Sequence, residues 1–330
     1  MQQLTLALSD LAWPHPQAAL PALHTPGLNR LLHWGRSQSQ AAAANSTFFG
    51  RFLWQGALLK QGLQTLGLPE SQAAFWCSPV HQHIGMHSAQ IISGNALAIQ
   101  ADEAAAWCAE LTRFFADSGW HFHPYRADLW LVSCPQPPQW QAAPILDLNH
   151  HLDAANKPSG HGANALLQAQ TEMQMLLHSH ALNHARQQHG LPPVNGVWCW
   201  RDATGEADPH TLLLTDSAWA QNSLPLRHTL PSSWTELQNQ YTASGSPIHT
   251  VMFDDSLMLP VAQGDGHTYA AQLQDWDQRW FMPAHHALAS GSLKQLCISS
   301  QHASLWVRKP ALPPFWRRQP VFQGAWLWVI

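Results

Sequence analysis

The sequence predicts an α/β fold, and three observations support this prediction. Short apolar runs typical of buried strands alternate along the chain with segments that repeat apolar residues at helical spacing. The chain has 330 residues, 45% of them hydrophobic, which is enough to bury a substantial core without covalent or metal staples. Its five cysteines include no CxxC pair, so neither a disulfide scaffold nor a structural zinc ribbon is indicated.

The strand predictions rest on runs rich in β-branched, aromatic and other apolar residues. The first run, LTLAL at 4–8, is short and continuous, as in a buried strand. Two further strand-like stretches, at 75–81 and 89–100, are punctuated by Gly85 and Gly94. The remaining predicted strands lie at 128–134, 197–200, 211–216, 248–255, 295–300 and 325–330.

Helices are predicted at 25–35, 102–117, 164–189 and around 273–281. In the first, Thr25 is suited to the N-cap and Pro26 to the first helical position. The third is long and stops at Gly190, with two prolines just beyond, which is a strong C-terminal signal. The stretch 135–163 is rich in Pro, Gly, His and Asn and is predicted to be a linker or an active-site loop.

Composition and charge exclude several classes of function. Charged residues make up 11% of the chain, against about 25% in an average soluble domain. The formal charge of −4 lacks the basic footprint of a nucleic-acid or anionic-membrane binder. No stretch approaches the roughly 20 apolar residues of a membrane span, and no signal-peptide pattern opens the chain. We therefore expect a cytoplasmic protein without nucleic-acid or membrane partners.

The 22 histidines raise the question of a metal site. Three pairs are spaced so that both rings lie on one face of a strand or helix: His81 and His83, His121 and His123, and His180 and His184. None belongs to a zinc signature such as HExxH. Packing and surface roles are the favoured interpretation, with a specific ligand set as the alternative.

The carboxylates are few and their positions are more informative. Asp254 and Asp255 end the strand predicted at 248–255, and Asp10 follows the first strand. In open α/β sheets, ligands bind at the carboxyl ends of the strands. These acids either serve such a site or cap the next turn, and both interpretations stay open. No dinucleotide fingerprint, P-loop or GxSxG elbow is present.

Two long stretches, 75–132 and 171–200, resemble the proteobacterial regulatory proteins of the RpfE type. Those proteins in turn resemble the archaeal-type cofactor-independent phosphoglycerate mutases of the alkaline-phosphatase superfamily. TPGLNRLLHWG at 25–35 is similar to a helix of that superfamily, and 248–280 followed by 298–302 has the order of its metal-binding half. The helix-plus-strand signature is carried here by His180-Ala181-Leu182-Asn183, Arg186, Gly190-Leu191-Pro192-Pro193 and Asn195.

The resemblance implies a three-layer α/β/α core with an inserted α+β module. Residues 1–70 and 164–330 would form the alkaline-phosphatase-like core, and 71–163 the inserted module. It also implies a centre of two divalent metals, Mn or Zn, with Asp and His ligands and a Ser or Thr nucleophile. Ser46 is the nearest nucleophile candidate. The remnants of the metal ligands would be Asp10, Asp254, Asp255, Asp265, His267 and His302.

The chain departs from the metal-binding pattern of this superfamily. Leu11 stands where a Gly follows the first Asp, and Gln301 precedes His302 where an Asp is expected. A neutral amide cannot supply the anionic charge that holds a hard divalent cation. The resemblance also makes Asn183, Arg186 and Asn195 candidates for binding an oxyanion, with bonding to the loop backbone as the alternative.

Our leading hypothesis is a catalytically degenerate, phosphoglycerate-mutase-like protein that binds a small ligand or a protein partner in a regulatory role and needs no cofactor. The alternative is an active metal-dependent phosphoglycerate mutase or phosphohydrolase that uses Mn or Zn in a rearranged site. The third hypothesis is a Trp-rich interaction scaffold, because the chain has 18 Trp and few charges.

Overall fold

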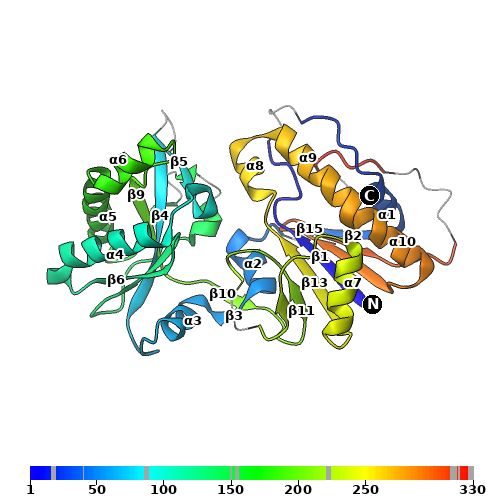
Figure 1. Cartoon of the computed structure of the whole chain (residues 1–330), viewed down its shortest axis with the longest axis horizontal. Helices are drawn as coiled ribbons and strands as arrows, with labels where there is room; N and C mark the ends of the chain where they lie inside the picture. Colours follow the sequence, from blue (N-terminus) through cyan, green and yellow to red (C-terminus); the bar gives the residue numbers. More distant parts are fainter. Residues whose placement is uncertain are drawn as a thin grey trace. The chain divides into compact units, whose positions relative to one another are not determined.

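The computed structural model describes residues 1–15, 20–39, 41–84, 89–148, 151–152, 156–220, 224–312, 318 and 320–325. The chain divides into two compact α/β units (Figure 1). Unit 1 comprises Met1–Gln55 and Gly205–Ile330, and unit 2 comprises Gly56–Thr204. The chain crosses between the units in β3 (Gln55–Ala57) and β10 (Thr204–Glu206), which pair with each other.

Unit 1 is built on a seven-stranded sheet of order β12-β11-β13-β1-β14-β15-β2. The neighbours from β12 to β14 run parallel, whereas β15 and β2 are added antiparallel. The central β1 is a short apolar run with buried neighbours on both sides, as its sequence predicts. The strands are β1 (Gln3–Leu8), β2 (Arg36–Ser39), β11 (Leu212–Leu214), β12 (Arg227–His228), β13 (His249–Asp254), β14 (Gln295–Ser299) and β15 (Ala303–Val307).

Helices cover both faces of this sheet, so unit 1 has three layers. Alternate strand residues such as Leu4 and Leu6 share one core with α1, α7, α9 and α10. On the opposite face, the ring of Phe253 in β13 contacts Phe48 and Phe49 of α2. The helices are α1 (Pro26–Trp34), α2 (Asn45–Leu53), α7 (Trp234–Ala243), α8 (Met258–Gln263), α9 (Gly266–Trp276) and α10 (Met282–Ser290), with a π-helical turn (Asp277–Phe281) joining the last two.

The start of α1 illustrates how local signals and distant contacts combine. The helix begins at Pro26 after Thr25, as predicted, but the Thr25 side chain makes no cap hydrogen bond. The buried Asp277 carboxylate instead accepts the backbone N–H groups of Gly27 at 2.9 Å and Leu28 at 2.7 Å. Gly27 lies so close to Met282 that a Cβ atom there would stand 2.5 Å from the Met282 nitrogen. Glycine is therefore required by close helix approach.

Unit 2 has a six-stranded sheet in which the long β4 pairs in turn with β7, β9 and β5. Helices α4 and α5 pack on this sheet in a core that includes Trp107 and Met173 (Figure 1). The strands are β4 (Ala74–Ile84), β5 (Ala89–Ser93), β6 (His121–Arg126), β7 (Leu129–Ser133), β8 (His151–Leu152) and β9 (Gly196–Trp200). The helices are α3 (Leu58–Thr65), α4 (Ala101–Phe114), α5 (Ala163–His178) and α6 (Ala181–Gln188), with 3-10 turns at Gly94–Leu97, Ala116–Ser118 and Ile145–Leu148.

The boundary of unit 2 differs from the module expected at 71–163. Residues 56–70 and 164–204 also belong to it, because β9 pairs with β4 and α3 packs on the same strand. The helix predicted at 164–189 is two helices, α5 and α6, separated at Ser179 and His180. His180 is the N-cap of α6: its backbone is extended, and its ring Nδ1 accepts the Leu182 backbone N–H. The helical hydrogen bonds of α5 therefore do not continue into α6. Most of the strand predicted at 325–330 lies outside the described residues.

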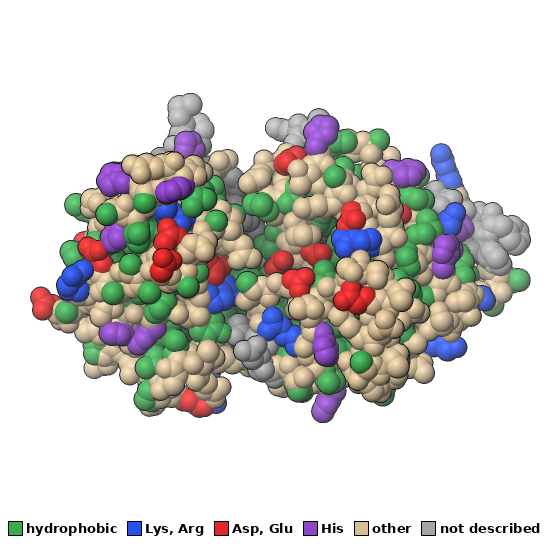
Figure 2. Space-filling model, viewed as in Figure 1, with side chains coloured by type: hydrophobic (Ala, Val, Ile, Leu, Met, Phe, Trp, Pro, Cys, Tyr) green, Lys and Arg blue, Asp and Glu red, His purple; other side chains and the backbone are tan. Residues whose placement is uncertain are grey.

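Charged side chains are sparse on the face drawn in Figure 2, where acidic, basic and histidine side chains are scattered among neutral ones. Across the described residues, no helix has both the length and the apolar character required to cross a membrane.

Candidate functional site

The candidate site of unit 1 lies where β1, β13 and β14 end side by side. Gln301, two residues beyond β14, is buried with 2% of its surface exposed. Its Nε2 donates to Ser9 Oγ at 2.8 Å and to Asn45 Oδ1 at 2.8 Å, and lies 3.2 Å from Asp10 Oδ1. Its Oε1 accepts the Asp10 backbone N–H at 3.0 Å. One amide group therefore connects the end of β1 to the first turn of α2.

Asp10 is the carboxylate at the centre of this network. Burial raises its pKa from 3.8 to about 6, although hydrogen bonds from Ser9 and Gln301 oppose that rise. Its φ of 56° is in the left-handed region, which Asp and Asn tolerate better than other non-glycine residues. This conformation turns the chain away from the sheet directly after β1 and holds the carboxyl group at its edge.

Asp254 and Asp255 lie at the same edge, at the end of β13. The Ser9 backbone N–H donates to the Asp254 carbonyl at 3.1 Å, which places the two strand ends together. The Asp254 side chain accepts Trp276 Nε1–H at 2.9 Å and the Ser256 backbone N–H at 2.6 Å. Asp255 Oδ2 accepts the Ser217 hydroxyl at 2.6 Å. The parallel-strand rule thus placed three acidic residues correctly at one edge, and each has donors from the protein itself.

The nucleophile candidate Ser46 lies in the first turn of α2 and is buried, next to Asn45. The Ala43 backbone N–H donates to the Gln301 carbonyl at 3.0 Å, so the segment leading into α2 is tied to the end of β14. The main-chain and side-chain bonds of Gln301 together fix the approach of α2 to the carboxyl edge.

The candidates from the C-terminal half have different surroundings. Asp265 is the N-cap of α9: its carboxylate accepts the Thr268 hydroxyl at 2.6 Å and the backbone N–H of His267 at 3.1 Å. These hydrogen bonds hold its pKa below the ordinary value. The side chains of His267 and His302 are exposed. Within the described ranges, no three His, Cys, Asp or Glu side chains are grouped so that they could hold a metal ion.

The candidates Asn183, Arg186 and Asn195 belong to unit 2, where they bond to loops. The Asn183 amide binds the Leu177 and Val194 backbone, and Asn195 bonds to both backbone groups of Gln82. Buried Arg186 pairs with Glu103 at 2.7 Å and donates to the carbonyls of Pro192 and Leu97.

The three histidine pairs have separate environments. His81 Nδ1 lies 2.9 Å from the Pro193 carbonyl oxygen, and His180 Nε2 lies 2.8 Å from Glu110 Oε2. The rings of His121 and His123 lie 4.4 Å apart on β6, as the i, i+2 spacing predicts. His123 Nε2 is 3.0 Å from the Ser133 hydroxyl, and burial lowers its pKa.

Sequence reasoning missed the partners that complete the carboxyl edge: Ser9, Asn45, Ser217 and Trp276. Ser9 offered a signal, because a polar residue directly after a buried strand lies at the same edge as Asp10. Ser217 and Trp276 offered none, since only the tertiary fold brings them to β13.

The sequence matches no protein-family model and no curated protein. Among solved structures, the chain is similar to the PH0037 protein from Pyrococcus horikoshii, with a TM-score of 0.53 and 12% identity over 93% of this chain and 87% of that one. The chain is also similar, more distantly, to the cofactor-independent phosphoglycerate mutase from Thermoplasma acidophilum, with a TM-score of 0.41 and 13% identity over 95% of this chain and 92% of that one. At such identities the likeness to PH0037 is one of fold.

Proposed function

We propose that the chain is a catalytically degenerate, phosphoglycerate-mutase-like protein whose role is binding or regulation. The observation that carries this proposal is the position of Gln301. Its amide nitrogen faces Ser9 Oγ, Asp10 Oδ1 and Asn45 Oδ1, three oxygens of the kind that a divalent cation would take as ligands. A hydrogen-bond donor thus stands where a cation would be needed.

The residues at this edge do not fit a centre of two divalent metals. An N–H donor repels a cation, and the neutral amide contributes no negative charge to offset the loss of the cation's water. The nearby carboxylates of Asp254 and Asp255 are engaged by Trp276, Ser256 and Ser217. We therefore derive no phosphoryl-transfer step at this edge and assign it a binding role, toward a small ligand or a protein partner.

One observation favours the alternative of an active metal-dependent enzyme: Asp10, Asp254 and Asp255 all gather at the carboxyl edge. That function would require Gln301 to leave the three oxygens that it now contacts. The third hypothesis, a Trp-rich interaction surface, finds less support, since Trp54, Trp76 and most other described tryptophans are buried in the cores.

Metal retention tests the proposal. The purified full chain is equilibrated with Mn²⁺ or Zn²⁺ and desalted, and its metal content is measured by mass spectrometry. We expect well below one ion per chain. Retention of about two ions per chain, the number that two-metal chemistry uses, would overturn the proposal.

The variant Gln301→Asp sharpens this test, because it replaces the donor with an anionic oxygen and should raise Mn²⁺ retention above that of the wild type. Gln2→Asp is the matched control: it makes the same charge change at an exposed residue next to the opposite end of β1, and should leave retention unchanged. Equal retention by both variants would show that Gln301 does not block a metal position.

A further inference from the structure

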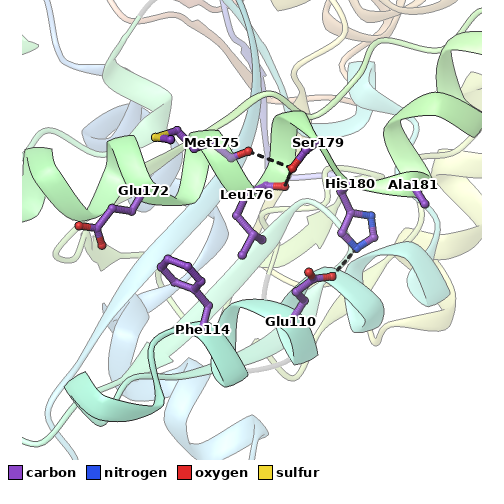
Figure 3. A pocket seen from close by; sticks show the side chains of 8 residues that line it. All are labelled: Glu110, Phe114, Glu172, Met175, Leu176, Ser179, His180 and Ala181. Atoms are coloured by element: carbon purple, nitrogen blue, oxygen red, sulfur yellow. Dashed lines mark hydrogen bonds and ion pairs between the residues drawn. The ribbon is translucent and has the colours of Figure 1, made fainter.

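Unit 2 carries a groove between α4 and α5 that none of the residues discussed for unit 1 enters. Its volume is about 550 Å³, within the range of ligand-binding clefts. Figure 3 shows side chains of both helices turned toward it. The lining residues are Glu110, Phe114, Glu172, Met175, Leu176, Ser179, His180 and Ala181.

One part of the groove is apolar and exposed to solvent. The side chains of Phe114 and Met175 expose 52% and 69% of their surface, although both belong to helices that bury their other faces in the core of unit 2. The Phe114 ring packs edge-on against the ring of the buried Phe115, with their centres 5.0 Å apart, and this contact holds it in place. With Leu176 they form an apolar surface that a partner could cover.

The other part of the groove is negatively charged. Glu110 and Glu172 both line it, and the eight lining residues include no Lys or Arg. Among the residues that the structure describes, Glu172 accepts a hydrogen bond only from the neutral Gln168 amide, at 3.1 Å.

His180 does not cancel this charge. Its Nδ1 accepts the Leu182 backbone N–H at 3.1 Å, so that nitrogen carries no proton. The proton therefore lies on Nε2, which donates to Glu110 Oε2 at 2.8 Å, and the ring is neutral. The hydrogen bond orients Glu110 while leaving its charge in place.

We propose that this groove binds an amphipathic, basic helix of a partner protein. The partner's apolar residues would cover Phe114, Met175 and Leu176, and its Lys or Arg side chains would pair with Glu110 and Glu172. The segment from Glu172 in α5 to Ser179, the residue after that helix, spans about 10 Å, the length of two turns of a docked helix. Met175 suits such a surface because its flexible thioether adapts to the shape of a partner.

A second copy of the chain is a poorer occupant. In a two-fold contact across this groove, each carboxylate pair would meet the same pair of its partner, which places like charges together. The proposal is independent of the function assigned to unit 1, so the failure of either one leaves the other untouched.

The test uses the full chain and a labelled 18-residue helical peptide of Leu and Lys, with Leu at i, i+3, i+4 and i+7. Binding is followed by fluorescence anisotropy. We expect the double variant Glu110→Gln/Glu172→Gln to weaken binding about fivefold, since each surface ion pair is individually weak. We expect Phe114→Ser/Met175→Ser, which changes two exposed residues, to weaken it as well. A peptide with Glu in place of every Lys should not bind.

The control variant Asp102→Asn/Glu206→Gln removes the same net charge at two exposed positions that do not line the groove, and it should bind the Leu/Lys peptide as the wild type does. If this control weakened peptide binding as much as Glu110→Gln/Glu172→Gln does, the effect would come from the chain's overall negative charge, and the proposal would be overturned. Unchanged binding by Phe114→Ser/Met175→Ser, or tight binding of the Glu peptide, would also overturn it.

Discussion

Replacing Asp10 with Asn should stabilise the protein by an amount that grows between about pH 4 and 6 and is complete above about pH 6. Burial raises the pKa of Asp10 from 3.8 to about 6, so the folded state holds this proton more tightly than the unfolded state. The contribution of this group to stability is therefore complete below pH 4 and is lost as the pH rises through 6. A difference of about 2 pKa units corresponds to about 3 kcal/mol of destabilisation once the carboxylate is ionised.

An asparagine in place of Asp10 carries no charge and so removes this cost, while it tolerates the φ of 56° as the aspartate does. The substituted amide side chain can still accept a hydrogen bond from Gln301 and meet the Ser9 hydroxyl. We expect Asp10→Asn to raise the free energy of unfolding by about 2 to 3 kcal/mol at pH 7.5 and to leave it nearly unchanged at pH 4.

The assay is urea unfolding followed by tryptophan fluorescence for both proteins between pH 4 and 8. Because only the ionised carboxylate carries the cost of burial, the gain should be absent at pH 4, and a gain of equal size at pH 4 and pH 7.5 would refute this prediction. Destabilisation at pH 7.5 would show instead that the charged form of Asp10 is stabilised by contacts in the folded protein.

Substitutions at three further places test the remaining contacts: the N-cap of α9, the start of α1 and the Arg186–Glu103 pair. Asp265→Asn should have the opposite pH dependence: the pKa of Asp265 is lowered by its cap hydrogen bonds, so the variant should lose stability at pH 7 and match the wild type at low pH, as measured by melting temperature. Asp277→Ala should lower the free energy of unfolding in urea by about 1 to 2 kcal/mol, because two N–H groups of α1 lose their acceptor. Gly27→Ala should lower it by about as much, because the added methyl group overpacks the contact with Met282. If neither substitution changes stability, these contacts do not fix the start of α1. Arg186→Met should lower the free energy of unfolding by about 3 kcal/mol, because it leaves the Glu103 carboxylate without its ion pair, and adding Glu103→Gln should restore part of that loss. If Arg186 has a structural role, phosphate should not raise the melting temperature of the wild type.

The burial and position of Asp10 bear on the proposed function. A buried carboxylate that costs stability near neutral pH is the kind of residue that selection for folding alone would replace. Its position at the carboxyl edge, beside Asp254 and Gln301, supports the binding role proposed for this edge.

Sequence alone determined the features that depend on neighbouring residues. The apolar run 4–8 predicted β1, and Pro26 with its spaced leucines predicted α1, because strand and helix periodicity are local properties. The carboxyl-edge position of Asp10 and Asp254 also followed from sequence, since parallel strands end at one edge of the sheet.

Only the tertiary structure decided which distant groups meet. Gln301 bonds to Asp10 across 291 positions, and Asp277 caps α1 across 250, and no periodicity in the chain encodes either pairing. The same holds for β9, which joins unit 2 because its edge pairs with β4. Such contacts are selected by the shape and polarity of the packed core, where each buried polar group must find a partner wherever the fold brings one.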